Sequence, residues 1–204
     1  MKNLTTFGAC AALSLAALTG AAQAEEGKAR AGWYVALGAG ANFIDDVDVT
    51  GGSFEMDTGY TILGAIGYDT GDITSYGKFR VETEVAYTEN DNDSVTVLGT
   101  KTNVGGTLEQ TTVMLNGYVD FVPGGTLRPY LGLGLGFVDG EHSISVLGFS
   151  GSGSGTEFAY RGAAGVTYHL TENWGLDLGY RYTAWESNGD VDNHSIVTSI
   201  RYGF

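Results

Sequence analysis

The most constraining feature of this sequence is a two-residue alternation between large apolar residues and small or polar ones. In residues 33–43, Trp33, Val35 and Leu37 occupy alternate positions, and most residues between them are small. Because successive side chains of a β-strand point to opposite faces, this period predicts a strand with a different environment on each side.

The alternation recurs in eight segments, each close to the roughly 9–11 residues that a transmembrane β-strand requires. The segments are 33–43, 60–68, 78–87, 108–121, 130–138, 158–170, 174–184 and 195–204. The links between them are alternately long (44–59, 89–107, 139–157, 185–194) and short (69–77, 122–129, 171–173). Outer-membrane barrels have long external loops and short periplasmic turns. We therefore predict an all-β fold, an eight-stranded antiparallel up-and-down transmembrane β-barrel.

The N-terminus indicates export. Lys2 precedes an apolar stretch at residues 4–18, and Ala22-Gln23-Ala24 forms a small-x-small cleavage site. This layout predicts a signal peptide at residues 1–24 and a barrel domain at residues 25–204. The barrel domain contains no apolar run long enough for a transmembrane helix.

Charge and motifs exclude several function classes. The net charge of −14 makes the chain a poor nucleic-acid binder. Cys10 is the only cysteine and lies inside the predicted signal peptide. No convincing Walker loop, zinc-ligand set or dinucleotide motif is present, so we expect no metal and no cofactor.

The placement of charged residues distinguishes a membrane barrel from a soluble one. Leu131, Leu133 and Leu135 form one face of their segment, whereas charged residues in other segments share a face with glycines. A soluble barrel would turn its leucines inward, but a narrow membrane barrel turns them outward and fills its interior with small and paired polar residues.

We expect an ion-pair network in the lumen, with four cationic and four anionic side chains, because an unpaired charge there is expensive to desolvate. Its predicted members are Arg80, Glu82, Glu84, Asp120, Arg161, Asp177, Arg181 and Arg201. The network is interpreted as a packed plug, and a gated polar pore is the alternative.

Aromatic residues concentrate at the ends of the apolar faces, as in the two interfacial girdles of membrane barrels. The predicted girdle residues are Trp33, Phe43, Tyr60, Tyr68, Phe79, Tyr87, Trp174 and Tyr182.

Four sequence stretches resemble the small outer-membrane β-barrel family that includes the OmpA transmembrane domain and the opacity-type proteins. They are Gly32-Trp33-Tyr34-Val35 and residues 128–134, 174–182 and 199–204. The resemblance implies the outer membrane of a Gram-negative bacterium, with lipids and lipopolysaccharide as surroundings. It implies a structural or surface-interaction role, and it gives Phe204 and Tyr202 a role as the signal read by the barrel-assembly machinery.

Three further hypotheses concern activity. A porin-like conduit for small polar or hydrophobic compounds is one alternative. Lipid-modifying catalysis is less favoured, because the neighbours in His142-Ser143 and His194-Ser195 would face opposite sides of a strand; we expect no catalytic residues. The acidic stretches 45–48 and 89–93 offer oxygen ligands to a cation or to an extracellular partner, although solvated loops are the simpler interpretation.

Overall fold

A computed structural model describes residues 31–44, 47–49, 52–74, 77–97, 100–103, 105–121, 126–146, 149–186 and 190–204. The predicted signal peptide lies outside these residues. No helix in the described part of the chain is long and apolar enough to cross a membrane.

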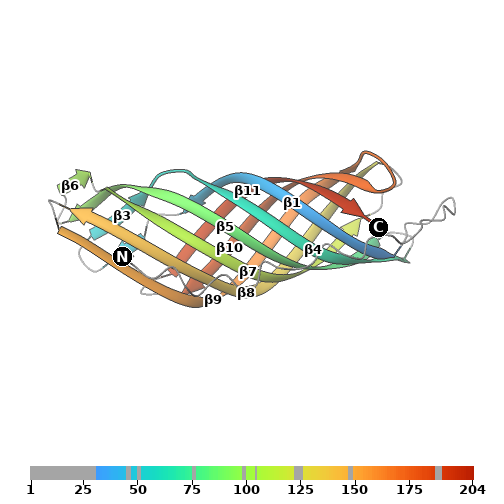
Figure 1. Cartoon of the computed structure of the whole chain (residues 1–204), viewed down its shortest axis with the longest axis horizontal. Helices are drawn as coiled ribbons and strands as arrows, with labels where there is room; N and C mark the ends of the chain where they lie inside the picture. The colour runs from blue at the N-terminus through green and yellow to red at the C-terminus, as the bar shows by residue number, and fades with distance from the viewer. Residues whose placement is uncertain are drawn as a thin grey trace, which may run out of the picture.

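Eight long antiparallel strands form a closed barrel (Figure 1). They are β1 (Gly32–Ile44), β4 (Gly59–Thr74), β5 (Gly77–Val97), β7 (Gly105–Phe121), β8 (Leu127–Val146), β9 (Phe149–His169), β10 (Trp174–Glu186) and β11 (Asp190–Gly203). Each strand pairs with the next, and β11 pairs with β1 to close the wall. The predicted fold class is confirmed.

The long links are largely strands, so their prediction as loops was wrong. β8 and β9 stay paired up to Val146 and Phe149, and the short strands β2 (Val47–Val49), β3 (Gly52–Met56) and β6 (Thr100–Asn103) extend the sheet around the outer part of β5. Beyond the apolar segments, charged, polar and small residues predominate in β5, β8 and β9. The hydrogen-bonded ladder therefore continues into stretches where the sequence shows no alternation that would predict a strand.

The outward face carries a continuous apolar band. On β8 three outward leucines, Leu131, Leu133 and Leu135, are followed by Phe137, and Leu133 is 77% exposed. The next outward positions, Asp139 and Glu141, are acidic, so the band ends there. Aromatic rings pair at its margins: Trp33 contacts Tyr68 with ring centroids 5.4 Å apart.

The structure places all eight predicted girdle residues on the outward-facing positions of their strands. Six of them are exposed, and Tyr87 and Tyr182 are partly buried.

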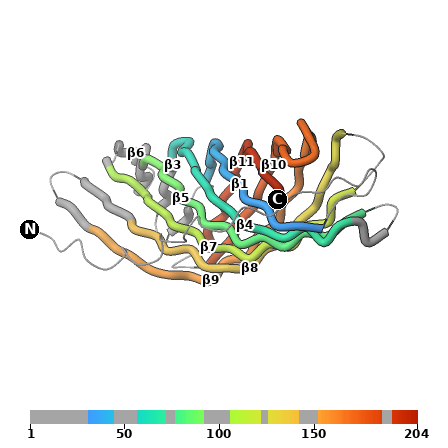
Figure 2. The backbone as a smooth tube through the Cα atoms, turned by 45° about the vertical axis from the view of Figure 1, so that its right-hand side comes forward, coloured from blue at the N-terminus to red at the C-terminus, as the bar shows by residue number. Residues whose placement is uncertain are grey.

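The two ends of the barrel differ. The short turns and the C-terminal end of β11 lie at one end, and the long extensions of β5, β7, β8 and β9 project from the other (Figure 1). Figure 2 shows β9 running past the ends of β10 and β11. By the pattern of outer-membrane barrels, the end with short turns faces the periplasm.

Candidate functional site

The barrel lumen holds most of the buried polar side chains, and inward-facing glycines make room for them. A Cβ atom on Gly67 would lie 2.3 Å from the Tyr34 ring, and one on Gly179 would lie 2.3 Å from the Tyr130 hydroxyl. The aromatic rings therefore occupy space that only glycine leaves free.

Glu84 is the centre of the ion pairs nearer the outer end. This fully buried carboxylate accepts Arg161 Nη1 at 2.6 Å through Oε1, and Arg181 Nη1 lies 2.7 Å from its Oε2. Arg161 Nε also donates to the Thr183 hydroxyl at 2.9 Å. One carboxylate thus connects three strands across the lumen: β5, β9 and β10.

Arg80 and Asp120 form a bidentate pair nearer the periplasmic end. Arg80 Nε and Nη2 donate to the two carboxylate oxygens at 2.7 Å and 2.9 Å. The same guanidinium lies 4.6 Å from the centroid of the Tyr118 ring, within cation–π range. Both members of the pair are buried.

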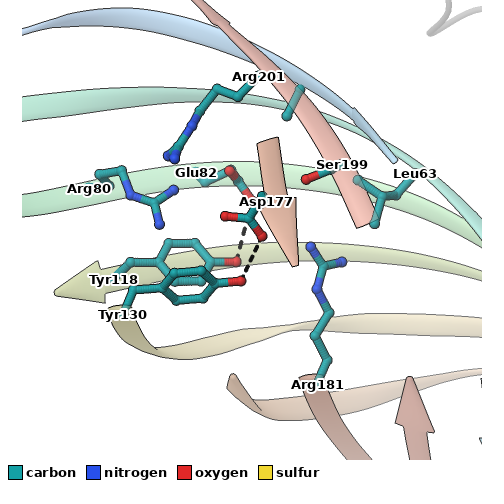
Figure 3. Close-up of a pocket in the computed structure, with 10 residues that line it drawn as sticks. Leu63, Arg80, Glu82, Tyr118, Tyr130, Asp177, Arg181, Ser199 and Arg201 are labelled. Atoms are coloured by element: carbon teal, nitrogen blue, oxygen red, sulfur yellow. Dashed lines mark hydrogen bonds between the residues drawn. The ribbon is translucent and has the colours of Figure 1, made fainter. Parts of the chain in front are cut away.

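Hydroxyl groups contact the other predicted members, and Figure 3 shows the contacts of Tyr118 with Glu82 and of Tyr130 with Asp177. Glu82 accepts the Tyr34 hydroxyl at 2.9 Å and the Tyr118 hydroxyl at 3.4 Å. Asp177 accepts the Tyr130 hydroxyl at 2.8 Å and the Thr167 hydroxyl at 2.8 Å. Thr167 in turn accepts Arg201 Nη2 at 2.8 Å.

The structure therefore joins five of the eight predicted members as ion pairs: Arg80, Asp120, Glu84, Arg161 and Arg181. Within the described residues, Glu82, Asp177 and Arg201 have no ion pair shorter than 4.0 Å and bond to hydroxyls instead. Tyr34, Tyr130 and Thr167 also belong to the network, although they are not among its predicted members. Each has the inward parity of its strand, and that parity is the signal that could have found them.

An apolar cluster lies in the interior among residues near the outer end. Met114, Val138, Ala159 and Trp185 are buried together, with Val191 packed against them. The outer part of the interior is thus partly apolar. Trp185 falls in a stretch predicted as a loop, where no alternation indicated its inward position.

Two small cavities remain between these groups. One is bordered by Arg80, Glu82 and Asp177, and the other by Arg161, Arg181 and Trp185. Each has a volume of about 20 Å³, enough for about one water molecule.

The predicted acidic and histidine sites show different surroundings. Glu89 accepts the hydroxyls of Tyr60 and Tyr87, each at 2.9 Å, on the outer surface. Ser195 donates inward to Asn42, whereas its neighbour His194 contacts the Tyr180 hydroxyl.

Within the described residues, no three His, Cys, Asp or Glu side chains gather as a metal site. The predicted acidic residues Asp45 and Asp46 lie outside these residues.

Comparison with known proteins gives consistent matches. The family described as "Outer membrane protein beta-barrel domain" matches residues 9–204. Outer membrane protein PagN of Salmonella typhimurium is 30% identical over an alignment 245 positions long that covers both chains completely. Neisserial surface protein A has a similar fold, with 24% identity, a TM-score of 0.57, and coverage of 88% of this chain and 100% of its own.

The Yersinia pestis attachment invasion locus protein, Ail, was solved in complex with the heparin analogue sucrose octasulfate. It shares the fold at 18% identity with a TM-score of 0.54, covering 85% of this chain and 99% of its own.

Proposed function

Because this chain belongs to the outer membrane protein β-barrel domain family, and is therefore an outer-membrane protein, we propose that it is a non-enzymatic surface-interaction protein with a closed lumen. The observation that carries this proposal is the contrast between the two parts of the barrel. Inside the apolar band, ion pairs and hydroxyl contacts link opposite walls. Outside it, long paired strands project into the external medium.

The lumen contacts support closure. An eight-stranded barrel has an interior just wide enough for side chains. Glu84 links β5 to β9 and β10. Nearer the periplasmic end, the Arg80 guanidinium stacks on the Tyr118 ring. Two cavities lie between these groups in the described part of the chain, and each has a volume of about 20 Å³. A continuous aqueous path would require several of these pairs to separate together.

We expect the purified monomer to show no large, steady conductance in a planar lipid bilayer. Brief small openings are compatible with an ion pair that exchanges partners. A steady, ohmic single-channel current would contradict the closed lumen and favour the porin-like alternative.

The outer hairpin of β8 and β9 supports the interaction role. Its strands stay paired for nine positions past the apolar band, from Val138 to Val146 on β8, which is about 30 Å of strand. Within the described residues, β9 pairs with β10 only over 159–169, so residues 149–158 present one unpaired strand edge. Such an edge can pair with an extended segment of another protein.

The charge of the outer surface restricts the partner. Outward positions beyond the apolar band carry carboxylates such as Glu109 and Glu141, and every Lys or Arg whose side chain is described lies on an inward-facing position. A neutral or basic protein surface fits this distribution. A sulfated sugar like the Ail ligand does not, because like charges would face each other.

Shortening the β8–β9 hairpin is expected to abolish attachment without unfolding the barrel. The variant deletes residues 141–154, most of the projecting part. Adhesion of bacteria displaying each form to epithelial cells measures the effect, and heat-dependent gel mobility checks that the barrel is closed. Unchanged adhesion by a folded, shortened protein would contradict the interaction role of this hairpin.

Export and assembly complete the proposal. Residues 1–24 act as a signal peptide, and Phe204 acts with Tyr202 as the signal for the barrel-assembly machinery. Removing Phe204 is expected to lower the amount of protein in the outer membrane several-fold, because recognition is lost. Refolding into detergent is expected to change little, since the side chain is 37% exposed. Normal outer-membrane levels in cells would contradict this role.

A further inference from the structure

The periplasmic mouth of the lumen is lined by an inward-facing position near the periplasmic end of each of the eight barrel strands. In barrel order these positions are Tyr34, Asp69, Lys78, Asp120, Arg128, His169, Gly175 and Arg201. They share the parity of the buried positions on their strands. Cationic and anionic residues are both present on β4, β5 and β7, whereas the charged residues at these positions on β8 to β11 are all basic.

One side of the mouth is internally neutralised. On β4, β5 and β7, Lys78 pairs with Asp69 and lies 3.9 Å from Asp120. Asp120 also holds Arg80 through both oxygens. Every cation on this side therefore has a carboxylate partner.

The other side has basic groups without carboxylates. On β8 to β11, Arg128, His169, Gly175 and Arg201 follow one another, and we call these four residues the basic arc. Arg128 and Arg201 form no ion pair with any described residue. The nearest inward carboxylate along β10, Asp177, already accepts hydrogen bonds on both oxygens.

Two nitrogen atoms of the basic arc lack partners. Arg128 Nε and His169 Nδ1 are buried and make no hydrogen bond within the described residues. Arg201 uses Nη2 to reach Thr167 and lies 5.2 Å from the Tyr34 ring centroid. Buried polar atoms in folded proteins nearly always have a partner, which can be ordered water, so the partner of these two atoms lies outside the described residues.

Gly175 places no side chain in the middle of the basic arc. It is opposite His169 on one side and Arg201 on the other. A Cβ atom at this position would lie 3.3 Å from Thr167 Cγ2 and 3.8 Å from Arg201 Nε. A side chain at this position would lie beside the Arg201 guanidinium and would need the Thr167 methyl group to move by a few tenths of an ångström.

We propose that the basic arc binds a phosphate group presented from the periplasm. Guanidinium groups match phosphate oxygens in geometry and charge. Donors that approach from β8, β9 and β11 can reach different oxygens of a tetrahedral group, which suits phosphate better than a planar carboxylate. The phosphate comes from free inorganic phosphate or from the headgroup of a phospholipid, and the chemistry of recognition is the same for both.

The first test titrates inorganic phosphate into the barrel in neutral detergent at constant ionic strength, read by ³¹P line width and thermal unfolding. We expect saturable binding and a raised unfolding temperature. Arg128→Gln is expected to weaken binding at least tenfold and to keep the phosphate-free stability, because it removes a cation that has no partner. Lys101→Gln removes the same charge from β6 at the far end of the barrel, so it should bind like the wild type.

A gain-of-stability variant separates binding from folding. Gly175→Asp places a carboxylate beside Arg201 and His169, so it should raise the unfolding temperature in phosphate-free buffer and abolish the response to phosphate. Loss of the response without any gain in stability would overturn the placement of Gly175 in the phosphate site.

A second titration distinguishes the two sources of the phosphate. It uses dihexanoyl phosphatidylglycerol below its critical micelle concentration, and a matched lipid without phosphate is the control. Saturation by the phospholipid alone assigns a headgroup, and saturation by inorganic phosphate assigns the free anion. If neither saturates, or if Arg128→Gln binds both as tightly as the wild type, the proposal is wrong.

Discussion

Replacing Glu84 with alanine is expected to lower the free energy of unfolding by about 3–5 kcal/mol, the typical effect of removing one partner from a buried ion pair. The carboxylate is fully buried and is the ion-pair partner of both Arg161 and Arg181. Its loss leaves two guanidinium groups in the lumen without their anion. Equilibrium unfolding in urea with the barrel in lipid vesicles measures the change.

Two variants give this measurement its controls. Asp91→Ala removes an exposed carboxylate from the same strand and is expected to change stability by about 0.5 kcal/mol or less. A triple variant, Glu84→Leu with Arg161→Met and Arg181→Met, replaces the whole charged group by apolar residues and should recover much of the loss. If the Glu84→Ala variant has the same urea midpoint of unfolding as the wild type, the prediction is wrong and the two arginines have other partners in the membrane.

The barrel strands could be predicted because the two sides of the wall meet different environments. Lipid on one side selects residues such as Leu133, and the crowded lumen on the other selects glycine or a paired polar group. This difference gives the two-residue period, so strand positions and facing follow from the sequence alone. The aromatic residues at the band margins follow from the same boundary.

The partners inside the lumen could not be predicted from the same pattern. Glu84 and Arg161 are 77 residues apart in sequence and meet across the lumen, and their meeting depends on strand register and tilt. The alternation places both side chains in the lumen but does not determine their positions along the barrel axis. The same limit explains why Glu82 bonds to tyrosine hydroxyls, although the balanced charges favoured ion pairs.

The strands of the outer hairpins could not be predicted from the alternation for another reason. Both faces of β8 and β9 meet water beyond Val138, so no environment there selects the alternation that would distinguish a strand from a loop. The serine- and glycine-rich residues 150–155 are typical of a loop, yet they pair with β8 in a continuous ladder. Backbone hydrogen bonds, which any residue except proline donates, maintain this part of the sheet.

Replacing Leu133 with arginine is expected to lower the free energy of unfolding by about 2–4 kcal/mol, the range for a cation near the bilayer midplane on the lipid face of a barrel. Leu133 is 77% exposed on the outward face, with the outward Leu131 and Leu135 on either side of it along β8. The arginine would have to reach toward an interface or thin the bilayer, because the described outward positions around it offer no carboxylate.

The matched control uses the same strand and the same face. Glu141→Arg lies eight residues further along β8, about 27 Å of strand, beyond the point where the apolar band ends at Phe137. Its side chain is exposed to water, so we expect a change of about 0.5 kcal/mol or less. Both variants are compared by urea unfolding in vesicles of the same lipid. Equal losses at the two positions would mean that the band boundary on β8 does not mark the membrane surface, whereas a large loss at Leu133 alone places that surface between Phe137 and Glu141.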